Sequence, residues 1–149
     1  PANAREYFAI ARNALSAYKA AGHLKTFVPP ASPVPEVQTA YAIGHTPGST
    51  VYRFASQGTA INFIGDLIHA PAVQFPHPEV SIRFDVDPKK AISSRGQEFN
   101  ALAKDGEWMA AAHLPFPGIG HITAWQQGYS WNPVNYGPYQ RAANVPLLK

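Results

Sequence analysis

Residues 41–50 read Tyr41-Ala-Ile-Gly-His45-Thr-Pro-Gly-Ser-Thr50, a short apolar run that ends in a histidine beside a Pro-Gly turn. Two later stretches have the same layout, Ile64-Gly-Asp66 and Ala112-His113-Leu-Pro-Phe-Pro-Gly-Ile-Gly-His121. In each stretch the run ends in a side chain that binds hard or borderline cations, an imidazole in the first and third and a carboxylate in the second. Loops that follow neighbouring strands emerge together at one edge of an α/β sheet, so we expect these three side chains to meet there.

The chain has 149 residues, of which 46% are hydrophobic and 14% are charged. This is enough for a globular core, and we assign residues 1–149 to one domain. No apolar run approaches the ~20 residues of a membrane helix, so we expect a soluble protein without a membrane partner. The chain begins at Pro1 without an initiator methionine or a leader, and we interpret it as a processed, proteolysed or cloned fragment. Its localisation stays open between the cytoplasm and the periplasm or secretion of a bacterial-type protein.

The absence of cysteine excludes disulfides, thiolate nucleophiles and cysteine zinc ligands. Any metal ion must therefore be held by histidine and carboxylate side chains. The net charge is +3, but the 12 basic residues are scattered and only Lys89 and Lys90 are adjacent. Nucleic acid binding needs a basic cluster, so we favour a solubilising excess of charge over a nucleic acid partner.

Hydrophobic periodicity and end signals predict two helices. The first runs from Asn3 to Gly22 and carries an apolar stripe that requires a covering surface. The second has Asp87 as its N-cap and Pro88 at its first position, and it ends at Gly106.

The strand pattern places most of the sheet between and after these helices. The predicted strands are Val37–Ile43, Thr50–Ala55, Thr59–Ile64, Glu107–Ala112 and a turn-linked pair, Ile122–Trp125 with Tyr129–Val134. The proline-rich segment Val28–Pro35 is an extended connector. Leu67–Val86 is predicted to be a long loop, a length that indicates a wall of a site.

A carboxylate can bridge two cations with its two oxygens, and we assign this role to Asp66, which is also our candidate catalytic residue. Two ions ~4 Å apart acidify a shared water molecule to hydroxide near neutral pH and polarise the electrophile. No protein nucleophile is then needed, in agreement with a chain that has no cysteine and no Gly-x-Ser-x-Gly elbow. The predicted metal ligands are His45, Asp66 and His113.

Each of these assignments has an ordinary alternative. His45 beside its turn could be a surface histidine, and Asp66 could cap the turn after its strand. His113 follows Met109-Ala-Ala-Ala112 and would be buried beside apolar residues unless a partner used its nitrogen.

The other four histidines receive weaker assignments. His121 and His69 could be ligands or supports, and we favour supports, with the ring nitrogen of His121 tying its loop in place. His23 and His77 are assigned to solvent.

Taken together, three blocks resemble the metallo-β-lactamase superfamily, in particular the branch that contains methyl parathion hydrolase and related lactonases. They are Gly44-His-Thr-Pro-Gly48, Gly65-Asp-Leu-Ile-His69 and residues 112–121, with Phe75-Pro-His-Pro-Glu79 and Phe84-Asp-Val-Asp87 between them. The resemblance implies an α/β fold, the four-layer αβ/βα sandwich. It also implies two divalent metal ions, zinc in first place with manganese, iron or cobalt as alternatives, and hydrolysis of esters, lactones or phosphotriesters.

By that resemblance, His45 would complete the ligand set of one ion, His113 would complete that of the other, and Asp66 would bridge them. Family members also carry an earlier His-x-His-x-Asp-His block, and no His-x-His occurs in this chain, so four ligands are absent. Ser49 stands where a second histidine commonly follows the first block. The chain therefore resembles the C-terminal half of the sandwich.

Half a sandwich would bind metal weakly and expose an apolar sheet face. We accordingly expect a complementary N-terminal half, or a second copy of the chain, as a partner. The first functional hypothesis is a dinuclear hydrolase acting on a small ester, lactone or organophosphate, with Phe75 and Phe116 either lining the pocket or in the core. The alternative is a non-catalytic half-fold assembly module, and a nuclease is the least favoured.

Overall fold

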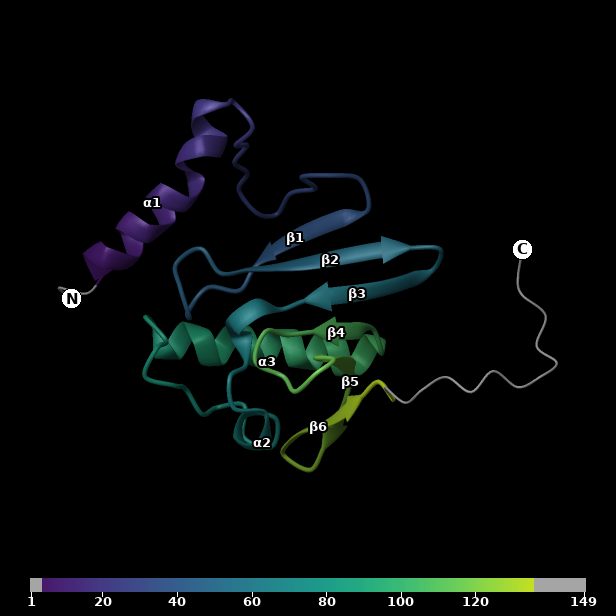
Figure 1. Ribbon diagram of the computed structural model, residues 1–149. Helices are drawn as coiled ribbons and strands as arrows, with labels where there is room; N and C mark the ends of the chain where they lie inside the picture. The colour runs from purple at the N-terminus through teal and green to yellow at the C-terminus, as the bar shows by residue number, and fades with distance from the viewer. Residues whose placement is uncertain (1–3, 136–149) are drawn as a thin grey trace.

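The computed structural model describes residues 4–135. Its helical segments are α1 (Ala4–Ala20), the 3-10 turn η1 (Gly65–Leu67), α2 (Pro71–Gln74) and α3 (Pro88–Asp105). Its strands are β1 (Val37–Tyr41), β2 (Thr50–Ser56), β3 (Thr59–Phe63), β4 (Trp108–Ala110), β5 (Ile119–Trp125) and β6 (Gly128–Pro133). The strands form one six-stranded sheet in the order β1-β2-β3-β4-β5-β6, with α3 behind it (Figure 1).

All neighbouring strands are antiparallel except β3 and β4, which are parallel. A parallel pair needs a long crossover, and here η1, α2 and α3 lie within it. The crossover helix α3 has the predicted end signals. The Asp87 side chain accepts a hydrogen bond from the Lys90 backbone N–H, Pro88 occupies the first turn, and Gly106 ends the helix at φ 67°.

The core lies between α3 and the sheet face that it covers. Phe99 and Leu102 of α3 belong to one buried cluster with Met109 of β4 and Ile122 of β5. Phe75 joins this cluster, with its ring parallel to that of Trp131 at 5.5 Å between centroids. Of the two roles considered for Phe75, the structure therefore gives it the core role.

The opposite sheet face is apolar and exposed. Tyr52 pairs with Phe63 and Phe54 with Ile61, so these side chains share one face. The three aromatic residues among them retain 40–45% of their surface. The apolar face expected of half a sandwich is present in the described part of the chain.

Helix α1 stands apart from the sheet (Figure 1). Its apolar residues Phe8, Leu15 and Tyr18 are exposed, so the predicted stripe has no covering surface among residues 4–135. The helix stops as predicted at Gly22, which has φ 71°, and the His23 N–H donates to the Tyr18 carbonyl at 2.9 Å. No helix in the described range is long and apolar enough to span a bilayer.

Two expectations about loops and strand limits are corrected. Leu67–Val86 is not a structureless loop, because it contains α2, which begins at Pro71. The buried Gln74 side chain holds this turn by accepting hydrogen bonds from the N–H groups of His69 and Ala70. β4 is shorter than the strand predicted at Glu107–Ala112, and β5 begins at Ile119 rather than at the predicted Ile122. The β4–β5 ladder contains only the pairs 109–120 and 110–119.

The loop after β1 packs directly on the start of α3. The Gly44 carbonyl accepts a hydrogen bond from the Asp87 N–H at 2.9 Å, and the Ser94 hydroxyl donates to the Ile43 carbonyl at 2.7 Å. Gly44 has φ 145°, and a Cβ there would lie 2.0 Å from the Ala91 backbone nitrogen. Only glycine fits at this close approach.

We predict that Gly44→Ala lowers the free energy of unfolding by about 2 kcal/mol or more, because it combines a backbone clash with a conformation that favours glycine. Gly48→Ala is the matched control, since a Cβ added at Gly48 would meet no atom within 4 Å. That control should stay within about 0.5 kcal/mol of the wild type. Denaturant unfolding measures both, and equal effects would contradict the packing described.

Candidate metal centre

The direction of the strands brings the three predicted ligands to one end of the sheet. β1 and β3 are both antiparallel to β2 and therefore run the same way, and β4 is parallel to β3. His45, Asp66 and His113 each follow the C-terminal end of one of these three strands. Loops leaving such strands share an edge.

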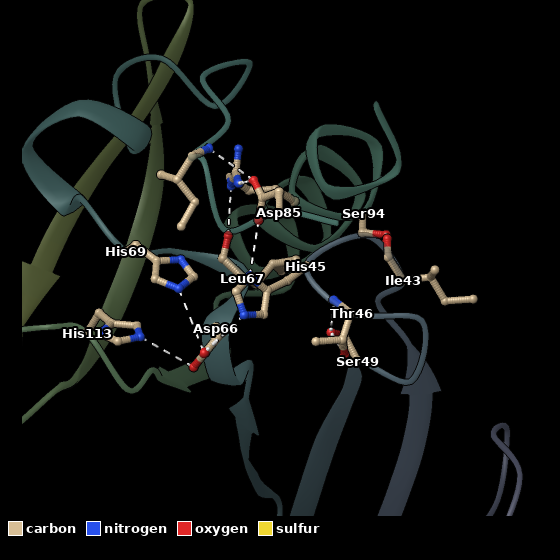
Figure 2. Close-up of polar contacts among 12 residues, drawn as sticks. Ile43, His45, Thr46, Ser49, Asp66, Leu67, His69, Asp85, Ser94 and His113 are labelled. Atoms are coloured by element: carbon tan, nitrogen blue, oxygen red, sulfur yellow. Dashed lines mark hydrogen bonds and ion pairs between the residues drawn. The ribbon is translucent and has the colours of Figure 1, made fainter. Parts of the chain in front are cut away.

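The three side chains meet in space (Figure 2). Asp66 Oδ2 lies 3.3 Å from His45 Nε2, and Asp66 Oδ1 lies 3.5 Å from His113 Nε2. The two carboxylate oxygens therefore face different imidazoles. The predicted convergence is confirmed, while the role of these residues as metal ligands stays a prediction.

His69 lies inside this group. Its Nε2 is 3.7 Å from Asp66 Oδ2, and its ring lies between those of His45 and His113, at 4.8 and 4.3 Å between centroids. Potential ligand atoms of His45, Asp66 and His69 all lie within 4.8 Å of one another. His69 lies beyond η1, which ends at Leu67, so the spacing in the sequence did not indicate this position.

His113 is not buried, contrary to the expectation from its apolar neighbours. Its side chain retains 43% of its surface. The reason is that β4 ends at Ala110, so His113 lies in the turn beyond the strand rather than in the strand itself.

The loop that carries His45 is closed by its own polar groups. The Ser49 hydroxyl accepts a hydrogen bond from the Thr46 N–H at 3.0 Å, and the Ser49 carbonyl accepts one from the Ala42 N–H at 2.8 Å. His45 and Asp66 line a pocket of about 290 Å³ beside this loop. Ser49 thus supports the loop. It occupies the position at which a second histidine is common in the family that the chain resembles.

Asp85 holds His45 from the side opposite Asp66. His45 Nδ1 lies 3.2 Å from Asp85 Oδ1, and the Asp85 side chain is 1% exposed. The second Asp85 oxygen accepts a hydrogen bond from the Ile82 N–H at 3.1 Å. His45 and Asp85 are 40 positions apart, so nothing in the local pattern around Asp85 predicts this contact.

The buried Arg95 of α3 connects this carboxylate to the neighbouring loops. Its Nη2 lies 3.8 Å from Asp85 Oδ2, and its Nε donates to the Leu67 carbonyl at 2.8 Å. Its Nη1 donates to the carbonyls of Pro78 and Val80, each at 2.8 Å. Burial lowers the pKa of Arg95, and the nearby Asp85 charge opposes this shift. Arg95 therefore ties η1 and the 78–85 segment to α3.

The donor set fits a divalent ion of the zinc type. Burial lowers the pKa of His69, and the neighbouring imidazoles of His113 and His45 lower it further, which favours the neutral form of the ring. Neutral imidazole and ionised carboxylate are the forms that bind zinc. His69 Nδ1 is also buried without a hydrogen-bond partner in the described residues, as expected where a group from outside this set completes a site.

The remaining candidates lie elsewhere. The His121 ring contacts Trp108 at 3.8 Å between centroids, and its Nδ1 lies 3.2 Å from the Glu107 carbonyl oxygen. The His121 ring nitrogen therefore contacts Glu107, just before β4, and not the loop that holds His113. The prediction that it ties that loop in place is corrected. His23 and His77 are exposed as predicted, and Phe116 is 80% exposed.

The chain is similar to several solved structures. It is 38% identical to the hydrolase AbOPH of the β-lactamase superfamily, with a TM-score of 0.80, over 85% of this chain and 44% of that one. It is 30% identical to AidC, a dizinc quorum-quenching lactonase, with a TM-score of 0.77, over 85% and 42% of the two chains. A probable metal-dependent hydrolase from Staphylococcus aureus is 22% identical, with a TM-score of 0.55, over 62% and 33%.

The chain thus spans less than half the length of each of these proteins. No protein-family model and no curated protein matches it. AbOPH is a hydrolase and AidC is a lactonase, and each match covers 85% of this chain. The chain therefore has the metallo-β-lactamase fold and resembles hydrolases of that superfamily.

Proposed function

We propose that this chain is the metal-binding part of a hydrolase that uses two divalent ions, zinc in first place, to cleave an ester, lactone or phosphotriester with water. The carboxylate of Asp66 carries the proposal, because one oxygen faces His45 and the other faces His113. A carboxylate in this position can bridge two cations. Bound divalent ions would lower the pKa of a water molecule and polarise the bond under attack.

The relatives support a hydrolytic site of this type. AidC is a dizinc lactonase that was solved with the product N-hexanoyl-L-homoserine, and AbOPH is a hydrolase. This chain spans 42% of AidC, so the substrate class is a proposal for the completed protein and not for these residues alone.

The residues around His45 support its role as a ligand. A histidine that binds metal through one ring nitrogen usually donates its other N–H to a carboxylate or carbonyl, which fixes the ring and its tautomer. His45 directs Nδ1 to Asp85 and Nε2 to Asp66. We infer that Asp85 keeps the proton on Nδ1 and leaves the Nε2 lone pair for the ion.

The chain supplies fewer donors than two ions need. We propose that a complementary N-terminal part, bearing the His-x-His-x-Asp-His block, provides the others and covers the exposed face around Tyr52, Phe54 and Phe63. This partner could be a preceding segment of the same protein or a separate chain.

A second candidate function is a non-catalytic assembly module that retains the half-fold. The absence of the His-x-His block from these 149 residues favours it. The retained group of Asp66 with three imidazoles favours the enzyme.

Fusing this chain to the complementary N-terminal part of AbOPH tests the two functions against each other. With Zn²⁺, we expect the fusion to hydrolyse at least one of an aryl ester, an N-acyl homoserine lactone and an aryl phosphotriester. Chelation and Asp66→Asn should each abolish the activity, whereas Asp105→Asn, at an exposed site, should retain it. A folded fusion that binds zinc without hydrolysing any of these substrates would favour the assembly module.

We predict that Asp85→Asn weakens zinc binding by about 10–100-fold, because it removes the group that orients His45. Asp105→Asn, the same substitution at an exposed position, should leave the affinity unchanged. Titration of Zn²⁺ against a competing chelator measures both variants. Equal affinities of Asp85→Asn and the wild type would refute the orienting role of Asp85.

A further inference from the structure

Two buried polar side chains, Gln74 of α2 and Arg95 of α3, hold the loops of the candidate metal centre. Gln74 is 0% exposed and Arg95 is 1% exposed. Burying an amide or a guanidinium group costs free energy unless hydrogen bonds compensate it. The partners of these two groups therefore show which segments they join.

Gln74 connects the turn after Asp66 with the segment that begins at Val80. Its Oε1 accepts hydrogen bonds from the His69 and Ala70 N–H groups at 2.8 and 2.9 Å. Its Nε2 donates to the Val80 carbonyl at 2.9 Å. α2 has only four residues, too few for a helix to be stable by itself, so we attribute the link between the two segments to this side chain.

The Val80 carbonyl is a shared acceptor. Arg95 Nη1 donates to the same oxygen at 2.8 Å, and Arg95 Nε donates to the Leu67 carbonyl at 2.8 Å. A carbonyl oxygen has two lone pairs, and two donors use them here. The turn that carries Asp66 and the segment that leads to Asp85 are thus both tied to one atom.

From Val80 the chain reaches Asp85 through a closed turn. The Asp85 N–H donates to the Ile82 carbonyl at 3.1 Å, and the Ile82 N–H donates to Asp85 Oδ2 at 3.1 Å. The other carboxylate oxygen, Oδ1, lies 3.2 Å from His45 Nδ1 (Figure 2). Because the turn is closed, a displacement of Val80 would move the Asp85 carboxylate relative to His45.

We propose that Gln74 is a positioning residue of the metal centre, which sets the place of the Asp85 carboxylate against His45 through the Val80 carbonyl. Gln74 itself supplies no ligand. The inference rests on the metal site proposed above and deepens it. Loss of Gln74 should loosen His45 in the folded protein, whereas loss of a merely stabilising residue would lower the free energy of unfolding and leave the folded site unchanged.

Gln74→Met removes the three hydrogen bonds at a similar side-chain length. We expect it to weaken Zn²⁺ binding roughly 10-fold, the lower limit for loss of a group that orients a ligand directly, in titration against a competing chelator. In the metal-free chain, the ¹⁵N NMR signals of the His45 ring should move toward those of Asp85→Asn. Because Gln74 acts through Asp85, Gln74→Met should change the affinity less than about 2-fold in the Asp85→Asn background.

Two variants serve as controls. Gln97→Met makes the same change at an exposed position of α3, and Ile122→Val destabilises the core without removing any of these hydrogen bonds. Both should keep the wild-type affinity and His45 signals. If Gln74→Met fails to fold, Gln74→Glu replaces it, because an ionised carboxylate keeps the acceptor oxygen and lacks the donor to Val80.

Wild-type His45 signals in a folded Gln74 variant, or additive effects of Gln74→Met and Asp85→Asn on zinc affinity, would overturn the positioning role and leave the proposed function standing. Absence of zinc binding by the wild-type chain would overturn the proposed function. The His45 signals of the metal-free chain would then still decide whether Gln74 positions His45.

Discussion

The parallel pairing of β3 with β4 is the constraint on which the candidate site depends. Because the two strands run in the same direction, Asp66 and His113 leave the sheet at the same edge although 47 positions separate them in the sequence numbering. β1 runs the same way and adds His45. A crossover is the only way to connect such a pair, and α3 within it also covers the core. One topological feature thus explains both the core and the convergence of the three predicted ligands.

Polar contacts from α3 then fix the loops at that edge. Arg95 binds the Leu67 carbonyl beside Asp66 and lies near Asp85, which in turn contacts His45. Gly44 allows the His45 loop to approach the start of α3. These contacts fix the side chains of the candidate site, which is the preorganisation that a catalytic site needs. Charge burial at Arg95 is tolerated because carbonyl oxygens and a carboxylate surround it.

The sequence predicts the strands and the three converging residues, since apolar runs that lead to His45, Asp66 and His113 are local patterns. The caps of α3 are predicted for the same reason. The contacts of Asp85 and Arg95 join residues distant in the chain, so no local pattern contains them. The position of His69 depends on η1 and on the hydrogen bonds of Gln74. The many prolines in this part of the sequence predict a loop, so neither feature is predicted. The solvent exposure of His113 depends on where β4 ends, which strand patterns define poorly.

The exposed faces of α1 and of the sheet agree with a chain that spans less than half of AbOPH and AidC. The central claim nevertheless concerns the described residues themselves, namely that the Asp66 carboxylate joins two ion positions. A crystal grown with Zn²⁺ and measured at the zinc absorption edge tests it most directly. The account predicts two anomalous peaks, one bonded to each Asp66 oxygen, on the His45 side and on the His113 side. Zinc bound elsewhere, with none in contact with Asp66, would contradict it.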